Sequence, residues 1–410
     1  MKANPIESKN PYCIAPWTAL YVQHDGSVFP CCHWTRFDSL GNLHESSFKD
    51  IWNSEKTKKL RLEMLQGVSP ANCVDCRFYE SIGEKSLRLN YKESQNKYLN
   101  RAAESDSTGH FEKLSLIYLS VGIGVQCQLQ CRTCGPTDSS SWQNEEQQKL
   151  KYGSITQEIP KTYLKNLIAN SNELERLLFV GGEPIINLLH YEILELVLKN
   201  ATQKLPDLFY NTNLFQLEWR SFNVFDYWKY FRKVNLFVSI DGDKKRFGYL
   251  RTGHNWKRLE KNISYIRENA PNVNLTAYVT ISNYNFYFLS DVLDSLFELN
   301  FEPNQILFNF VKIPEHMSVI NAPQRLKENS IKKNNFLIKK LISKYELSEV
   351  LHLIKCIQSL NYFILSEEPN DHKFREFLIF NKVNKVPEKF GSFEQLFFEL
   401  INENRMENHV

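Results

Sequence analysis

The sequence lacks the features of membrane, secreted and nucleic-acid-binding proteins. Nowhere in its 410 residues is there a run of the roughly 18 apolar residues that a membrane span needs. The segment Met1 to Pro11 is polar and has no apolar core like that of a signal peptide, so we expect a cytoplasmic protein with no membrane partner. The net charge is only +3, and no basic stripe gathers the Lys and Arg residues. No nucleic-acid partner is therefore expected.

Internal repeats and low-complexity tracts are also absent, and the length suits one large domain with smaller additions. Cysteine, in contrast, is concentrated. Eight of the nine cysteines precede residue 135. Cytoplasmic thiols are kept reduced, so this concentration indicates metal or cluster ligation rather than disulfide bonds.

The middle of the chain alternates between apolar segments typical of strands and segments with helical periodicity. Strands that alternate with helices favour a parallel sheet with helical crossovers. Six such units are fewer than the eight that close a full barrel. We therefore predict an α/β fold, a partial (β/α)6 TIM-like barrel, with strands at Leu114–Val121, Arg176–Val180, Asp207–Asn211, Val234–Ile240, Val273–Ile281 and Gln305–Val311.

The remaining chain divides around this barrel. Residues 1–80 are predicted to form a small cysteine-rich domain, and the polar stretch 81–110 a linker. The barrel is assigned to 111–315. Residues 316–410 are predicted to form an α-rich C-terminal extension.

Directly after the first predicted strand, three cysteines share one short loop: Cys127, Cys131 and Cys134. Thiolates are the usual ligands of a [4Fe–4S] cluster, and three of them leave one iron without a protein ligand. S-adenosylmethionine (AdoMet) can chelate such an iron. An electron from the cluster then releases a 5′-deoxyadenosyl radical. A zinc site or a chance group of buried cysteines is the alternative explanation.

This loop and its place after the first strand resemble the radical SAM superfamily, whose three cysteines bind the reducing cluster. The end of the second strand, Gly181-Gly182-Glu183-Pro184, resembles the GGEP motif of that family. The resemblance implies that these four residues contact the AdoMet amino group. A tight strand–helix turn would account for the same residues without a ligand.

Three further residues match AdoMet-binding positions of the family. Asn213 follows the third strand, although Leu214 stands where glycine is usual. The resemblance implies that Ser239 reaches the ribose and Arg251 the carboxylate of AdoMet. Asp241 is equally explained as the cap of the next helix, and Arg251 as a surface ion-pair residue.

Before the barrel, a predicted hairpin at Val28 and Phe29 would bring distant cysteines together. Four cysteines, Cys13, Cys31, Cys73 and Cys76, would form a closed thiolate site. The pattern resembles the SPASM domain in its shortened twitch form, which implies a second, auxiliary [4Fe–4S] cluster. The domain usually follows the barrel, and the full form uses more cysteines. Tetrahedral zinc, and Cys32 or His33 as a ligand, remain alternatives.

The resemblance covers roughly residues 11 to 315 and implies an enzyme of the oxidoreductase or peptide-modifying class. It would abstract hydrogen from a peptide or protein side chain, with a flavodoxin- or ferredoxin-like electron donor. Radical oxidation of a sugar- or nucleoside-like molecule is the second hypothesis. A non-catalytic iron–sulfur or zinc binding module is the third. No acid–base residue is predicted.

Overall fold

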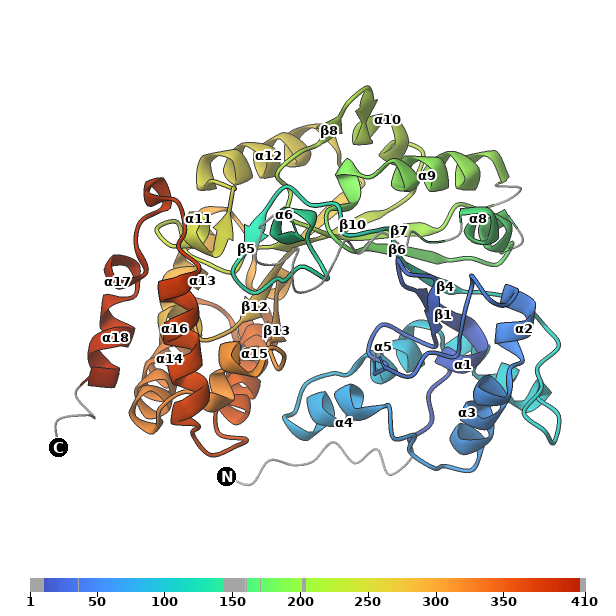
Figure 1. The fold of residues 1–410 in the computed structure, drawn as a ribbon, viewed down its shortest axis with the longest axis horizontal. Coiled ribbons are helices and arrows are strands. Elements are labelled where there is room, and N and C mark those ends of the chain that lie inside the picture. The colour runs from blue at the N-terminus through green and yellow to red at the C-terminus, as the bar shows by residue number, and fades with distance from the viewer. Residues whose placement is uncertain are drawn as a thin grey trace.

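The computed structural model describes residues 11–35, 37–143, 159, 161–169, 171–200 and 204–405. The outer ends of the expected N- and C-terminal regions, including the polar segment Met1 to Asn10, lie outside the described residues. Within the described part, one sheet has nine strands in the order β13-β12-β10-β7-β6-β4-β1-β2-β3 (Figure 1). This sheet organises the molecule.

Six of these strands are parallel neighbours and form the partial barrel. The predicted fold class is therefore confirmed, and the carboxyl ends of all six strands meet at one edge. They are β4 (Tyr118–Gly122), β6 (Arg176–Val180), β7 (Asp207–Thr212), β10 (Val234–Ser239), β12 (Val273–Ile281) and β13 (Ile306–Phe310).

Helices follow the strands as crossover connections. They are α8 (Lys161–Ala169), α9 (Leu188–Asn200), α10 (Val224–Trp228), α12 (Trp256–Asn269) and α13 (Leu289–Glu298). In Figure 1, α9 and α12 lie above the strands, the N-terminal region lies at the lower right and the C-terminal helices lie at the left and lower left. Leu259, Ile263 and Ile266 of α12 are buried on one face, as their spacing predicts.

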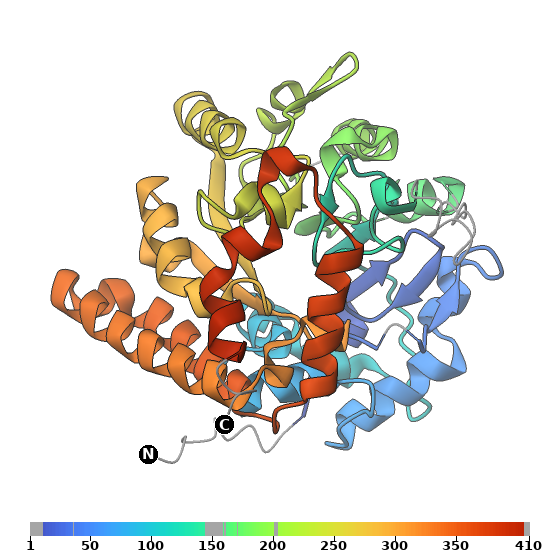
Figure 2. The same ribbon diagram turned by 60° about the vertical axis from the view of Figure 1, so that its left-hand side comes forward.

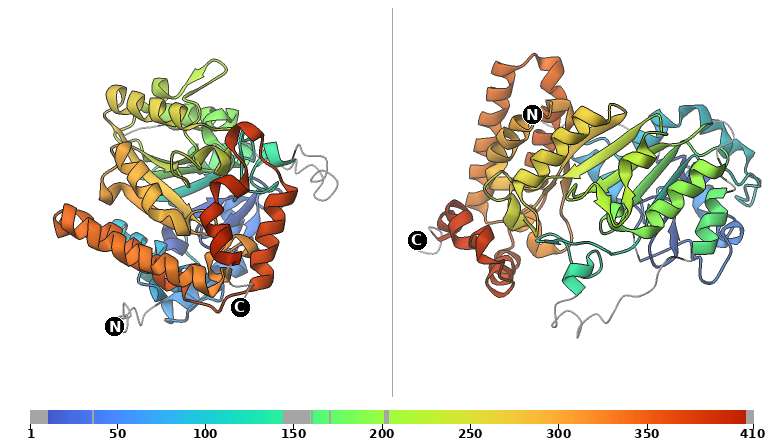
Figure 3. Two further views of the ribbon diagram at one scale, coloured as in Figure 1. Left: turned by 90° about the vertical axis from the view of Figure 1, so that its left-hand side faces the viewer. Right: turned by 90° about the horizontal axis from the view of Figure 1, so that it is seen from above.

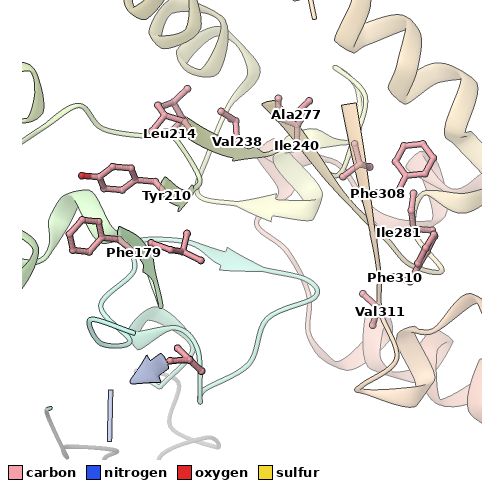
Figure 4. Close-up of a cluster of buried hydrophobic side chains, with 14 of the residues drawn as sticks. Phe179, Tyr210, Leu214, Val238, Ile240, Ala277, Ile281, Phe308, Phe310 and Val311 are labelled. Carbon is pink, nitrogen blue, oxygen red and sulfur yellow. The ribbon is translucent and has the colours of Figure 1, made fainter. Parts of the chain in front are cut away.

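The strands separate a packed core from a more open inner face. Along β12, Ala277, Val279 and Ile281 are buried, whereas the intervening Tyr278 and Thr280 are only partly buried. Successive side chains of a strand point to opposite faces, so one face can pack while the other borders a cavity. Figure 4 shows part of the packed set, in which Phe179 stacks on Tyr210 with ring centroids 5.1 Å apart.

The N-terminal cysteine-rich region continues the barrel sheet. Its strand β1 (Ala19–Val22) pairs in parallel with β4, and β2 (Ser27–Phe29) returns antiparallel to β1, as the predicted hairpin requires. The short β3 (Gly41–Asn42) forms the edge of the sheet. Helices α1 (Ala15–Thr18), α2 (Phe48–Trp52), α3 (Glu55–Leu65) and α4 (Val74–Ser81) complete the region.

The stretch 81–110, expected as a linker, is largely helical. It contains α5 (Leu87–Ser94) and the 3-10 helix η1 (Asn96–Glu104). Arg88 pairs with Glu80 at 2.7 Å, and Arg101 pairs with Glu173 at 2.6 Å, so two polar residues of this stretch hold it to its surroundings. Its helices expose many of their polar residues to solvent, while the two arginines are buried in ion pairs.

The C-terminal region is helical, as predicted. It contains α14 (Gln324–Lys344), α15 (Leu347–Ile364), α16 (Asp371–Val383), α17 (Phe393–Leu396) and α18 (Phe398–Arg405). In Figures 2 and 3, the red helices α16 to α18 lie beside the barrel, on the side away from the strands of the N-terminal region. In the described part of the chain, no helix is both long and apolar enough to cross a membrane.

Helix α4 joins the two ends of the sheet. The N-terminal region to which α4 belongs is joined to the barrel at one side, where β1 pairs with β4. On the other side, Phe78 of α4 contacts Phe363 of α15, with ring centroids 5.4 Å apart. Tyr79 stacks on Phe310 of β13 at 6.1 Å. The N-terminal region therefore spans the gap that a six-stranded barrel leaves open.

Candidate functional site

A cavity of about 800 Å³ opens at the carboxyl ends of the parallel strands. Parallel barrels characteristically build their sites at this edge. Eight of the residues predicted to bind a cluster or AdoMet line the cavity: Cys127, Cys131, Cys134, Gly181, Gly182, Asn213, Ser239 and Arg251. Glu183 and Pro184 do not line it, because they turn into the protein behind Gly182.

Short local elements hold the three-cysteine loop in place. Strand β5 (Gln130–Cys131) pairs antiparallel with β11 (Arg251–Thr252), which sets Cys131 opposite Arg251. Helix α6 (Ser140–Gln143) supplies donors to the loop. Ser141 Oγ donates to the Cys127 carbonyl at 2.7 Å, and Trp142 Nε1 donates to the Cys131 carbonyl at 3.0 Å.

The three thiols of this loop lie close enough to affect one another. A hydrogen bond with Cys134 lowers the pKa of Cys131, and the same bond raises the pKa of Cys134 well above its ordinary value. Burial, and then Cys131, raises the pKa of Cys127 to about 12. The three cysteines therefore lie close together, and all three line the cavity.

Two donors from the barrel face these sulfurs. Arg251 Nη1 lies 3.6 Å from Cys131 Sγ, and Asn213 Nδ2 lies 3.7 Å from Cys127 Sγ. A nearby cation favours the thiolate form, which is the form that binds metal. Three neighbouring thiols, two of them with donors directed at their sulfurs, fit the ligand set of a [4Fe–4S] cluster.

Gly181 and Gly182 allow the cysteine loop to dock on the end of β6. Gly182 N donates to the Gly124 carbonyl and Glu183 N to the Gln126 carbonyl, each at 2.8 Å. A Cβ on Gly182 would lie 2.3 Å from the Gln126 oxygen, and one on Gly181 2.4 Å from the Gly124 oxygen. The glycines thus admit the neighbouring backbone while they also border the cavity.

Glu183 is held by the end of the next strand. Its carboxylate accepts hydrogen bonds from Thr212 Oγ1 and from the Asn213 amide, both at 2.7 Å. Ile185 N donates to it at 3.3 Å. Burial raises the pKa of Glu183 to about 7 despite these donors. The predicted contact between Glu183 and AdoMet stays a prediction.

Leu214, which stands where the family usually has glycine, adopts a backbone conformation that favours glycine. Leu214 has φ of +53°, in the left-handed region, and its side chain is fully buried. Such a conformation costs a non-glycine residue about 1 kcal/mol. Burial of the leucine offsets this cost, and Asn213 beside it still faces Cys127.

Asp241 and Arg251 form a buried ion pair rather than a helix cap and a surface residue. Arg251 Nη2 donates to Asp241 Oδ2 at 2.6 Å, and both side chains are at least nine-tenths buried. The other Asp241 oxygen accepts from Thr280 N at 2.8 Å. Burial lowers the pKa of Arg251, but Asp241 and Cys131 raise it above its ordinary value. Ser239 borders the same part of the cavity.

The four predicted N-terminal ligands also come together. Cys13 precedes α1, Cys31 follows β2, and Cys73 and Cys76 lie at the start of α4. Burial raises the pKa of Cys13 to about 12, to which Cys76 and Cys73 contribute. Burial also raises the pKa of Cys31 well above its ordinary value, together with charge repulsion from neighbouring cysteines that include all three others.

Cys32 is close to Cys31 and to tyrosines of the barrel strands. Burial raises the pKa of Tyr278 to about 12, and Cys32 adds to the shift, so the thiol is near a residue that lines the cavity. His33 packs on Tyr79, with ring centroids 5.7 Å apart. Among the described residues, no three His, Cys, Asp or Glu side chains are arranged around the position of a single metal ion. The choice of Cys31 over Cys32 stays a prediction.

The sequence did not predict that the N-terminal region and the barrel together form one wall of the cavity. Lys312, just after β13, donates to Asp75 Oδ1 at 2.8 Å, inside the Cys73–Cys76 segment. Tyr79 donates to Asn309 Oδ1 at 3.1 Å. Lys312 and Asn309 line the cavity, as do Tyr278 and the turn residue His24. No local motif marks these residues, because their neighbours are distant in sequence.

Comparison with known families assigns both regions. Residues 121–287 match the radical SAM superfamily, and residues 13–77 match the SPASM iron–sulfur cluster-binding domain. These matches include all seven cysteines predicted as ligands. No curated protein matches the sequence.

Solved structures show more distant similarity. Native anSMEcpe with bound AdoMet is 17% identical over 55% of this chain and 61% of that chain, with a TM-score of 0.39. Streptococcus suis SuiB bound to precursor peptide SuiA is 14% identical over 71% of this chain and 60% of that chain, also with a TM-score of 0.39. Both matches span less than two thirds of the other chain. Likenesses of this size say nothing about what the present chain binds.

Proposed function

We propose that the chain is a two-cluster enzyme that abstracts hydrogen from a peptide or protein side chain, because residues 121–287 match the radical SAM superfamily and residues 13–77 match the SPASM iron–sulfur cluster-binding domain. A radical SAM domain uses one [4Fe–4S] cluster and AdoMet, and a SPASM domain implies auxiliary clusters.

One observation carries the proposal. The sulfurs of Cys127, Cys131 and Cys134 share one cavity with Gly181, Gly182, Asn213, Ser239 and Arg251. Eight of the ten residues that are proposed to bind the AdoMet cluster or AdoMet therefore line one cavity, although they follow four different strands, β4, β6, β7 and β10. This is the arrangement that reductive AdoMet cleavage needs.

The chain's own residues have distinct tasks at this site. The three thiolates would ligate three irons of the cluster. Arg251, fixed by Asp241, offers its guanidinium beside Cys131, where the AdoMet carboxylate would lie. Ser239 would meet the ribose. The chemistry supplied here by a bound cluster with AdoMet is reductive cleavage of a sulfonium S–C bond to a 5′-deoxyadenosyl radical. The cavity walls orient the substrate and exclude other hydrogen donors.

The auxiliary site adjoins the part of the cavity that faces the N-terminal region. Cys13, Cys31, Cys73 and Cys76 would hold the second cluster, and α4, which begins at this site, also contributes the wall contacts to Lys312 and Asn309. A cluster so placed can take an electron from a substrate radical. Its position supports an oxidative outcome.

The substrate would enter against the wall shared by the N-terminal hairpin and the end of β13. This wall presents His24, Asp25, Asn309 and Lys312, which are polar or charged. Polar groups at fixed positions confer specificity on a ligand pocket. A peptide backbone with a side chain directed inward suits this wall. A hydroxyl-rich sugar or nucleoside would use the same polar groups, so it remains the second candidate.

Iron and sulfide analysis with electron paramagnetic resonance tests the cluster assignment. We expect about eight irons per chain in anaerobically reconstituted protein and about four in the Cys127→Ala/Cys131→Ala/Cys134→Ala variant. AdoMet should change the spectrum of the wild-type protein alone. Cys356→Ala, which alters a buried cysteine of α15, is the matched control and should keep about eight irons.

Other outcomes redirect the proposal. About four irons with one zinc would make the N-terminal site structural. A fully reconstituted protein whose spectrum ignores AdoMet would support a non-catalytic module and overturn the enzyme assignment. Deuterium transfer from labelled peptides into 5′-deoxyadenosine would establish the peptide substrate. Transfer from labelled sugars alone would replace it.

A further inference from the structure

Asn381, on the C-terminal helix α16, receives three hydrogen bonds on one side-chain oxygen. Tyr284 Oη donates to its Oδ1 at 2.8 Å, Tyr249 Oη at 2.9 Å and Arg132 Nη2 at 3.2 Å. Its own Nδ2 donates to Phe377 O at 2.8 Å, which fixes the orientation of the amide. All four side chains are at most 5% exposed. A carbonyl oxygen with three buried donors is fully used.

The three donors belong to separate parts of the barrel. Arg132 lies in the cysteine loop directly after Cys131, and Tyr249 lies in α11 (Phe247–Leu250), directly before β11. Tyr284 follows β12. The Arg132 amide also donates to Leu250 O at 2.8 Å. Asn381 thus ties the cysteine loop to two elements that flank it, from a region that neither family match includes.

Arg132 is a buried cation in an aromatic setting. It is 2% exposed, and its guanidinium lies 4.7 Å from the centre of the Phe380 ring and 5.5 Å from that of Tyr249. Within the described part of the chain, no carboxylate forms an ion pair with it. A buried charge without a counter-charge is costly. A cluster ligated by thiolates is negatively charged, and Arg132 directly follows the proposed ligand Cys131, so such a cluster would bring a countercharge to the neighbouring residue.

We propose that Asn381 and Arg132 are positioning residues for the AdoMet cluster. Asn381 holds the guanidinium in place and thereby orders the Cys131–Cys134 segment before any cluster binds. The fixed charge of Arg132 then stabilises the reduced cluster, because reduction adds negative charge. The second statement rests on the proposed function, whereas the first concerns the cluster-free protein as well.

Hydrogen exchange of the cluster-free full chain tests the first statement. Asn381→Leu should speed exchange of the backbone amides in 127–135 by about tenfold, because three buried donors lose their acceptor. Asn384→Leu is the matched control, since Asn384 directly follows α16 and its side chain donates to Phe380 O of that helix. Arg132→Lys, a milder change, should speed the same amides without disturbing α16. Equal exchange in the loop for the wild type, Asn381→Leu and Arg132→Lys would overturn the positioning role.

A reductive titration of the reconstituted protein, monitored by electron paramagnetic resonance, tests the second statement. Arg132→Gln should lower the midpoint potential of the AdoMet cluster, because it removes a positive charge. Arg132→Lys should keep the potential near that of the wild type. An unchanged potential in Arg132→Gln overturns the charge role. Failure of the wild-type protein to form any AdoMet-responsive cluster would instead contradict the proposed function and leave the exchange result to decide the positioning role.

Discussion

At the scale of single residues, Glu183 shows how burial overrides hydrogen bonding. Three donors favour its charged form, yet removal from water raises its pKa to about 7. Arg251 is also buried, but Asp241, with Cys131 and Cys134, raises its pKa above the ordinary value. The difference arises because Glu183 has neutral donors as partners while Arg251 has a full opposite charge.

The raised pKa of Glu183 predicts a dependence of stability on pH. Between its ordinary value of 4.5 and about 7, the folded chain keeps a proton that the unfolded chain releases. The free energy of unfolding should therefore fall as pH rises through this window, by about 3 kcal/mol in total. Glu183→Gln removes this contribution. Chemical denaturation of the cluster-free protein at pH 5 and pH 8 should show a smaller loss in the variant, and parallel losses would contradict the assignment.

At the scale of elements, the end of β6 is the docking point of the cysteine loop. The hydrogen bonds from Gly182 and Glu183 to the backbone of Gly124 and Gln126 act like a short extension of the sheet. On its other side, β5 of the loop pairs with β11. The loop is thus held between two strand ends by backbone hydrogen bonds.

The close approach at Gly182 predicts a sharp response to one methyl group. Gly182→Ala should lower the free energy of unfolding by about 3 kcal/mol, because its Cβ would meet a backbone oxygen that has no room to move. Gly135→Ala, in the same loop but with open space around it, should change stability by less than about 0.5 kcal/mol. Thermal or chemical unfolding measures both variants. Similar losses in the two would show that the approach is not tight.

At the scale of the whole molecule, the N-terminal region closes a barrel that six strands leave open. It extends the sheet beyond β4 and reaches β13 and α15 with α4. The closing contacts also border the cavity, since Lys312 and Asn309 belong to both. The auxiliary region is therefore part of the site's wall as well as a separate cysteine centre.

The ion pair between Asp75 and Lys312 predicts measurable coupling across this closure. Lys312 also lies 3.8 Å from the centre of the Phe78 ring, which limits its freedom. A double-mutant cycle with Asp75→Asn and Lys312→Met should give about 1 kcal/mol of coupling in unfolding experiments. The more exposed pair Lys340–Asp294, on α14 and α13, should give less than about 0.5 kcal/mol. A coupling energy of zero for Asp75 and Lys312 would show that this ion pair does not stabilise the contact between the N-terminal region and β13.

The sequence by itself determined the elements and the cysteine loop. Strands β6 and β12 begin and end at the predicted residues, and the other four barrel strands lie within a few residues of their predicted positions. Their signals are local, because apolar runs and flanking turn residues depend on neighbours in the chain. The CxxxCxxC spacing is equally local, and it placed three thiols in one loop before any fold was known.

Tertiary structure alone decided how distant residues combine. It joined β1 to β4, made helices of the expected linker, and gave Asp241 an arginine instead of a helix end. It also brought Asn381 to Arg132, 249 positions earlier in the chain. No periodicity encodes such pairs, because they form only when complete elements pack. Local sequence determines which segments form helices and strands. The packing of the complete barrel determines which side chains meet at the cavity.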